Sequence, residues 1–190
     1  MVLKSEIEKD AKNLMASLRT DYRIPTSGEI ISPVIKVMSV VYFMHIAAII
    51  ANEFFHKDDV WLLGIALWLF LSCGILTVMA LMMAYSNLSI LMCIQKKVRD
   101  DSLLISIGKK KLKIYGFVIV TINVFVAIIL ITEGHEFILG YGFSWFVCML
   151  VGGLTFSMSM TRYMTPAVVA TFDKIREVVS SEAKGKQLHG

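Results

Sequence analysis

Four long apolar runs dominate this sequence and restrict the architectures that the chain can adopt. They cover residues 33–52, 61–84, 114–132 and 144–164. Each is close to the length of about 20 residues that a helix needs to cross a bilayer. None shows the recurring polar positions that the outer face of a helix needs in a soluble bundle. We therefore predict an all-α integral membrane protein with four transmembrane helices.

The charged residues are few and lie mostly outside these runs. Of the 190 residues, 56% are hydrophobic and 18% are charged, and the net charge is +4. Such bunching of charge excludes a soluble globule. Because a charge of +4 indicates nucleic-acid binding only when it is focused on one surface, we expect no direct binding of nucleic acid.

Lysine and arginine alternate between the segments that separate the runs. The rich segments are the head and turn over residues 1–32, a loop over 95–113 and a tail over 165–190, with five, seven and four such residues. The loops over 53–60 and 133–143 hold one between them. Because cytoplasmic segments carry the excess of lysine and arginine, we predict that both termini and the basic loop are cytoplasmic. We interpret the basic loop as topogenic charge that also attracts anionic lipid.

The second run is longer than a membrane crossing requires. The residues from Val60 to Ile94 number 35 and carry no charge. One helix of that length would span about 52 Å, whereas the hydrocarbon core is roughly 30 Å thick. We predict that this helix leaves the bilayer near Tyr85, or bends at Ser86-Asn87, and continues as a helical cytoplasmic extension to residue 94. An apolar extension in water needs a partner, which the head or the tail can supply.

Both ends of the chain have the pattern of an amphipathic helix. Apolar residues recur at helical spacing in each: Leu3, Ile7, Leu14 and Leu18 in the head, and Val168, Phe172, Ile175 and Val179 in the tail. The other face of the head is charged. The sequence leaves open whether each helix lies on the membrane surface or packs against the protein.

The apolar runs contain few groups that can carry out chemistry. We interpret His45 as a packing residue, and Asn123 can join two helices through a hydrogen bond worth about 1 kcal/mol. The small residues Gly152, Gly153 and Ser157 allow close helix packing. The sequence has no catalytic motif, phosphate-binding loop, CxxC pair or metal-ligand spacing. We therefore expect no catalytic residue, cofactor or metal, and an interaction protein rather than an enzyme.

The first 45 residues carry a resemblance to a known family. A charged head contains Ser5-Glu-Ile-Glu, the sequence Arg23-Ile-Pro-Thr-Ser follows, and Pro33 lies at the start of the first apolar run. This arrangement resembles the TraS-type surface/entry-exclusion proteins of F-like conjugative plasmids, and beyond it only the hydropathy is similar. The resemblance implies a protein of the bacterial inner membrane that blocks redundant conjugative DNA transfer into a plasmid-bearing cell. It also implies a partner, the donor's mating-pair stabilisation protein TraG.

The turn between the head and the first run has a local explanation and a functional one. Locally, Pro25 ends the head, Ser27 or Ser32 caps the next helix, and Pro33 occupies its first turn. The functional hypothesis assigns partner binding to polar residues of the turn and the basic loop: Arg23, Thr26, Glu29, Lys96, Lys97 and Arg99.

Two other functions stay open, as does self-association into a homo-oligomer. One is an immunity protein against a pore-forming bacteriocin, which would also be compact and without catalytic residues. The other is a small transporter or channel subunit, which needs polar residues along a path through the membrane. The residues available for such a path are few: His45, Thr77, Thr121 and Asn123.

The predicted orientation can be tested with reporter fusions. Fusions at Lys57 and Glu136 should report the periplasm, and fusions at Asp101 and the C-terminus should report the cytoplasm, because the basic segments stay inside. An external signal at Asp101 would contradict the predicted topology.

Overall fold

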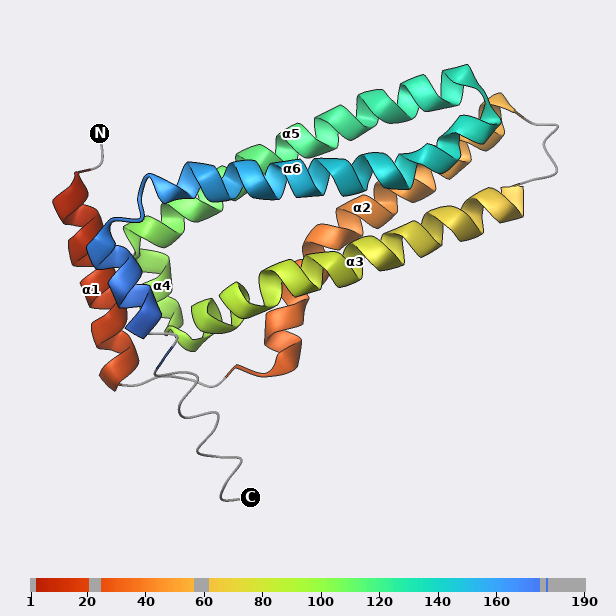
Figure 1. Ribbon diagram of the computed structural model, residues 1–190. Coiled ribbons are helices and arrows are strands. Elements are labelled where there is room, and N and C mark those ends of the chain that lie inside the picture. The colour runs from red at the N-terminus through yellow and green to blue at the C-terminus, as the bar shows by residue number, and fades with distance from the viewer. Residues whose placement is uncertain (1–2, 21–24, 57–61, 175–176, 178–190) are drawn as a thin grey trace. The chain divides into compact units, whose positions relative to one another are not determined.

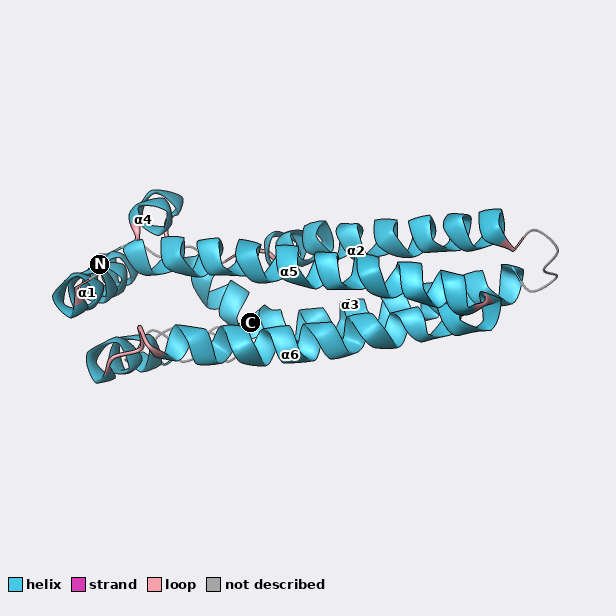
Figure 2. Cartoon of the chain, turned by 90° about the horizontal axis from the view of Figure 1, so that it is seen from above, coloured by secondary structure: helices cyan, strands magenta, loops and turns pink. Residues whose placement is uncertain are grey.

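The computed structural model describes residues 3–20, 25–56, 62–174 and 177, and this part of the chain contains helices and no strand (Figures 1 and 2). The elements in chain order are α1 (Lys4–Thr20), α2 (Ser27–Phe55), α3 (Leu62–Cys93), α4 (Lys96–Asp101), α5 (Leu103–Glu133), the 3-10 helix η1 (His135–Gly140) and α6 (Tyr141–Thr161). Residues 166–174 form a further short helix.

Four segments are long and apolar enough to cross a membrane: α2, α3, α5 and Glu136–Thr161. In the most apolar stretch of each segment, only 17% to 28% is buried inside the protein. Large apolar side chains such as Met82 and Phe117 therefore face outward, which suits contact with lipid and not with water. The prediction of an all-α chain with four helices able to span a membrane is confirmed.

The first of these helices begins earlier than predicted, at Ser27. Thr26 and Glu29 form a reciprocal capping box there: the Thr26 N–H donates to Glu29 Oε2 (3.0 Å) and the Glu29 N–H to Thr26 Oγ1 (3.4 Å). The prediction that Ser27 or Ser32 caps this helix is therefore wrong. Pro33 lies inside the helix and not in its first turn, where it provides no N–H for the intrahelical hydrogen-bond pattern.

The segment 95–113, predicted as a basic loop, is almost entirely helical. It consists of α4 and the first turns of α5, which begins at Leu103 and not at residue 114. α3 runs without a break through Ser86-Asn87 to Cys93. The chain leaves the helical conformation at Gln95, where φ is −52° and ψ is 138°.

The chain divides into two compact units. Unit 1 comprises Met1–Ile30, Tyr85–Leu112 and Phe156–Gly190, and unit 2 comprises Ile31–Ala84 and Lys113–Thr155. Each of α2, α3, α5 and α6 contributes residues to both units. In α3 the change falls between Ala84 and Tyr85, the position at which the sequence predicts that the helix leaves the bilayer.

Unit 2 has one buried face on α2 with the spacing of a coiled-coil seam. The buried residues of this face alternate in steps of four and three: Val34, Met38, Val41, His45, Ala48 and Asn52. This spacing keeps one stripe of a helix turned toward its neighbours. Residues between these positions, such as Phe43 and Ile50, are largely exposed and give α2 an apolar outer face.

Unit 1 is held together by two apolar clusters. In the first, Leu14 of α1 packs against Cys93 and Ile94, and Phe172 lies against the same cluster. The second cluster joins α1 to the start of α5 and to the helix over 166–174. The buried members of this cluster are Ile7, Ala11, Leu104 and Val168. The end of α3 therefore contacts both the head and the tail, as the length of its apolar run predicts.

Cys93 provides a native reporter for the docking of α1, because its side chain is buried beside Leu14. In a chain with Cys73→Ala and Cys148→Ala, we expect Leu14→Asp to accelerate labelling of Cys93 by a water-soluble maleimide by about tenfold or more. A carboxylate placed in this apolar cluster is expensive to desolvate and should separate α1 from it. Lys12→Asp is the control, since Lys12 is exposed on the same helix. Equal labelling rates in both variants would show that α1 does not cover Cys93.

Candidate functional site

α1 is attached to unit 1 by a carboxylate as well as by its apolar stripe. Asp10 Oδ2 accepts hydrogen bonds from Ser102 Oγ (2.8 Å) and from the Leu104 N–H (2.9 Å). Ser102 Oγ in turn accepts a hydrogen bond from the Ile105 N–H (3.3 Å). Asp10 and Ser102 together cap the N-terminus of α5, where the unpaired N–H groups and the helix dipole favour a negative charge.

A lysine joins the first turns of α5 to the end of α6. Lys111 Nζ donates to the carbonyl oxygen of Ser159 at 2.8 Å and also to Ser159 Oγ. The same ammonium lies 4.7 Å from the centre of the Tyr163 ring, a distance at which a cation is attracted to the aromatic face. Lys111 is thus engaged within the protein, although the sequence places it in a run of basic residues.

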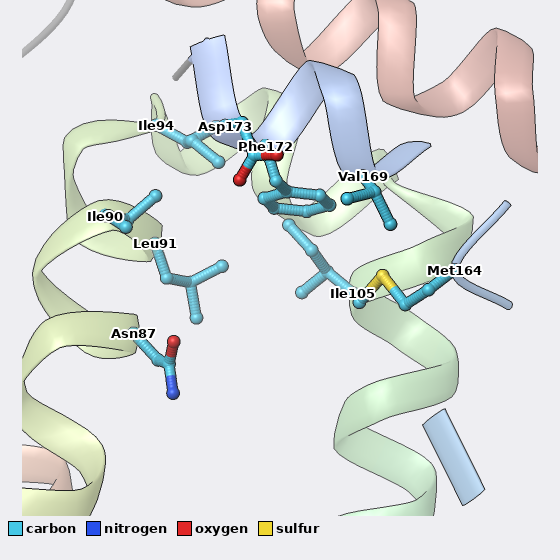
Figure 3. Close-up of a pocket in the computed structure, with 9 residues that line it drawn as sticks. All are labelled: Asn87, Ile90, Leu91, Ile94, Ile105, Met164, Val169, Phe172 and Asp173. Atoms are coloured by element: carbon cyan, nitrogen blue, oxygen red, sulfur yellow. The ribbon is translucent and has the colours of Figure 1, made fainter. Parts of the chain in front are cut away.

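An apolar groove of about 310 Å³ opens in unit 1 (Figure 3). One wall comes from the end of α3, and the helix over 166–174 crosses the end of the groove. Ile105 and Met164 complete it. The groove has two polar lining residues, Asn87 and Asp173, and the rest of its lining is aliphatic, aromatic or thioether.

The residues predicted to bind a partner are not gathered at this groove. Thr26 and Glu29 cap α2, and Arg23 lies outside the described residues. Lys96 and Lys97 are exposed on α4. Arg99 on the same helix is partly buried, and its Nη1 lies 2.9 Å from Met92 Sδ. Of the five described residues, Thr26, Lys96 and Lys97 are exposed, and Thr26, Glu29 and Arg99 make structural contacts.

Asn123 joins two helices of unit 2. Its side chain is fully buried, with Nδ2 donating to the Ile119 carbonyl (2.9 Å) and Oδ1 accepting from Ser144 Oγ (2.9 Å). The second bond runs from α6 to α5. Asn123 therefore makes the kind of interhelical contact that the sequence suggests, and its partner Ser144 is identified by the structure alone.

The glycines of α6 allow side chains of two neighbouring helices to approach closely. A Cβ atom at Gly152 would lie 2.6 Å from Ile119 Cδ1, and one at Gly153 would lie 3.1 Å from Met83 Cε. Larger residues at these positions would displace α5 or α3 side chains. Ser157, grouped with these glycines in the sequence interpretation, has an exposed side chain.

His45 lies in a buried polar and aromatic cluster of unit 2. Its Nδ1 donates to the Val41 carbonyl at 2.9 Å, and Ser72 Oγ lies 3.5 Å from Nε2. The ring centre is 4.9 Å from that of Tyr141 and 6.2 Å from that of Trp145. His45 thus packs between helices, as interpreted from the sequence, and the two aromatic partners come from α6.

No constellation of catalytic groups appears among these contacts. Within the described ranges, no group of three or more histidine, cysteine, aspartate or glutamate residues could hold a metal ion. Comparison with models of known families, with curated proteins and with solved structures finds no match. The strongest candidate site is therefore the surface of unit 1, where the groove and the exposed lysines of α4 lie.

The hydrogen bonds of Asp10 should contribute to the free energy with which α1 docks on unit 1. Replacing Asp10 by alanine removes a helix cap and should weaken the docking of α1 by about 1–2 kcal/mol. Loss of an N-terminal epitope tag to trypsin should then be about five- to thirty-fold faster. Asp101→Ala, at an exposed aspartate of α4, should leave the rate unchanged. An unchanged rate for Asp10→Ala would mean that the apolar stripe alone holds α1.

Proposed function

We propose that this chain is an entry-exclusion protein of a bacterial inner membrane, which blocks redundant conjugative transfer by binding a mating-pair protein of the donor. The observation that carries the proposal is the construction of unit 1. Segments from the beginning, middle and end of the chain are gathered into one folded surface with a groove. Such a surface suits recognition of a protein.

The distribution of charge supports the orientation of this surface. All three lysine- and arginine-rich segments contribute to unit 1. By the positive-inside rule, unit 1 faces the cytoplasm together with both termini. The exposed Lys96 and Lys97 of α4 are then placed to contact anionic lipid or an acidic region of the partner.

The available area favours recognition through unit 1. A stable protein interface needs roughly 20 residues from each side. The loops over 53–60 and 133–143 are too short to supply that number, and η1 occupies much of the second. Unit 1 supplies it without using the lipid-facing positions of the spanning helices. The donor protein must then reach the recipient's cytoplasm or meet unit 1 at the membrane.

A mating experiment tests the proposal. A recipient that makes the full chain should receive the matching plasmid at a frequency at least tenfold lower than a recipient without it, while an unrelated transfer system should be unaffected. The control is a recipient that makes the same amount of a variant with Gly152→Leu, in which the tight contact with Ile119 is disrupted. Undiminished mating with the intact chain would overturn exclusion and favour bacteriocin immunity.

Exchange of segments between two exclusion proteins of different specificity locates the recognition surface. Specificity should move with residues 1–32, 85–113 and 156–174 exchanged together, because α1, the end of α3, α4, the start of α5 and the helix over 166–174 belong to unit 1. If specificity moves instead with residues 53–60 and 133–143, recognition is periplasmic.

A further inference from the structure

The α3 wall of the groove in unit 1 has the spacing of a helix face. The α3 side is lined at positions i, i+3, i+4 and i+7: Asn87, Ile90, Leu91 and Ile94. This wall is about 10 Å long at 1.5 Å per residue, or two helical turns. The helix over 166–174 crosses the end of this wall and brings Val169 and Phe172 to the groove, while Ile105 and Met164 line the side that faces α3 (Figure 3). The α3 wall, the helix over 166–174 and the side with Ile105 and Met164 enclose an apolar trough that suits the side chains of another helix.

The polar groups of the groove are Asn87 and Asp173. Both are exposed, and neither makes a hydrogen bond or an ion pair with another described residue. Asp173 therefore leaves a negative charge without a described counter-charge at the edge of an apolar trough. A ligand that fills this trough gains most if it combines apolar side chains with a cation.

The combination of an apolar lining with the carboxylate of Asp173 distinguishes between the possible occupants of the groove. The carboxylate of Asp173 disfavours an anionic phospholipid headgroup by like-charge repulsion. A small apolar molecule would fill a groove at the low end of ligand-site volumes and would leave Asp173 unpaired. An amphipathic helix supplies apolar side chains at the required spacing, covers the open side and carries lysine or arginine at its margin.

We propose that the groove binds two turns of an amphipathic helix of the partner protein, with its apolar side chains in the trough and a lysine or arginine paired with Asp173. This inference rests on the proposed function, because it names the element by which the partner is recognised. Ile90 and Phe172 form the apolar contact. Asp173 selects the charge of the helix and thereby its register.

Two synthetic helical peptides test the inference. They share leucines at i, i+3 and i+7 and differ at one flanking position, which is lysine in the first and glutamate in the second. Binding to the full-length protein in zwitterionic nanodiscs is measured by fluorescence anisotropy, with empty nanodiscs as the blank. We expect the lysine peptide to bind about tenfold more tightly, because lysine is attracted to the carboxylate of Asp173 and glutamate is repelled by it.

Variants at the rim and at the wall separate charge from shape. Asp173→Lys should reverse the preference, and Asp173→Asn should abolish it. Asp101→Lys, the same change at an exposed aspartate of α4, should preserve it. Ile90→Asp should weaken both peptides about tenfold or more, because it places a charge in the apolar wall.

Equal binding of the two peptides, or an unchanged preference in Asp173→Lys, would overturn the inference. The peptide assay is independent of mating, so the two proposals can fail separately. Charge-selective binding by a chain that does not reduce mating would leave the groove assignment intact and remove exclusion. Exclusion without charge-selective binding would remove the groove assignment alone.

Discussion

The apolar end of α3 has to be covered, and the construction of unit 1 follows from that requirement. With 32 residues, α3 is about 48 Å long, whereas the hydrocarbon core of a bilayer is roughly 30 Å thick. Leu14 from the head and Phe172 from the tail cover the excess. Burial of Ile7 and Leu14 contributes about 3–6 kcal/mol to the docking of α1.

Much of this arrangement could be predicted from local patterns. The length of the apolar runs and their low content of charged residues predict the number of spanning helices. The run that starts at Val60 is longer than a membrane crossing and predicts an extension covered by other parts of the chain. The spacing of Ile7 and Leu14 predicts a helix with one apolar face. The inward face of α2 could not be predicted in the same way, because exposed residues such as Phe43 are as apolar as buried ones. When a helix is apolar on all sides, its sequence does not show which face packs against other helices.

The other structural features that were not predicted depend on local helix formation or on long-range contacts. The lysines of residues 109–113 suggest a loop, yet a helix accommodates them by exposing some and joining Lys111 to Ser159. Asp10 caps α5 from a position more than ninety residues earlier in the chain, which no local pattern reveals. The groove likewise depends on side chains brought together from α3 and the tail. Tertiary contacts of this kind decide the candidate site, and they leave no signature in a single sequence.

The distribution of unit 1 along the chain has a consequence for its biosynthesis. The apolar residues that end at Ile94 leave the ribosome long before Phe172, their cover from the tail, has been translated. At about 5–20 residues per second, the roughly 80 residues between them take about 4–16 s. During that interval α1 is the cover already available, so the head acts as a temporary shield for the nascent chain. A product that terminates before the tail would keep part of this apolar surface open and would be prone to aggregation.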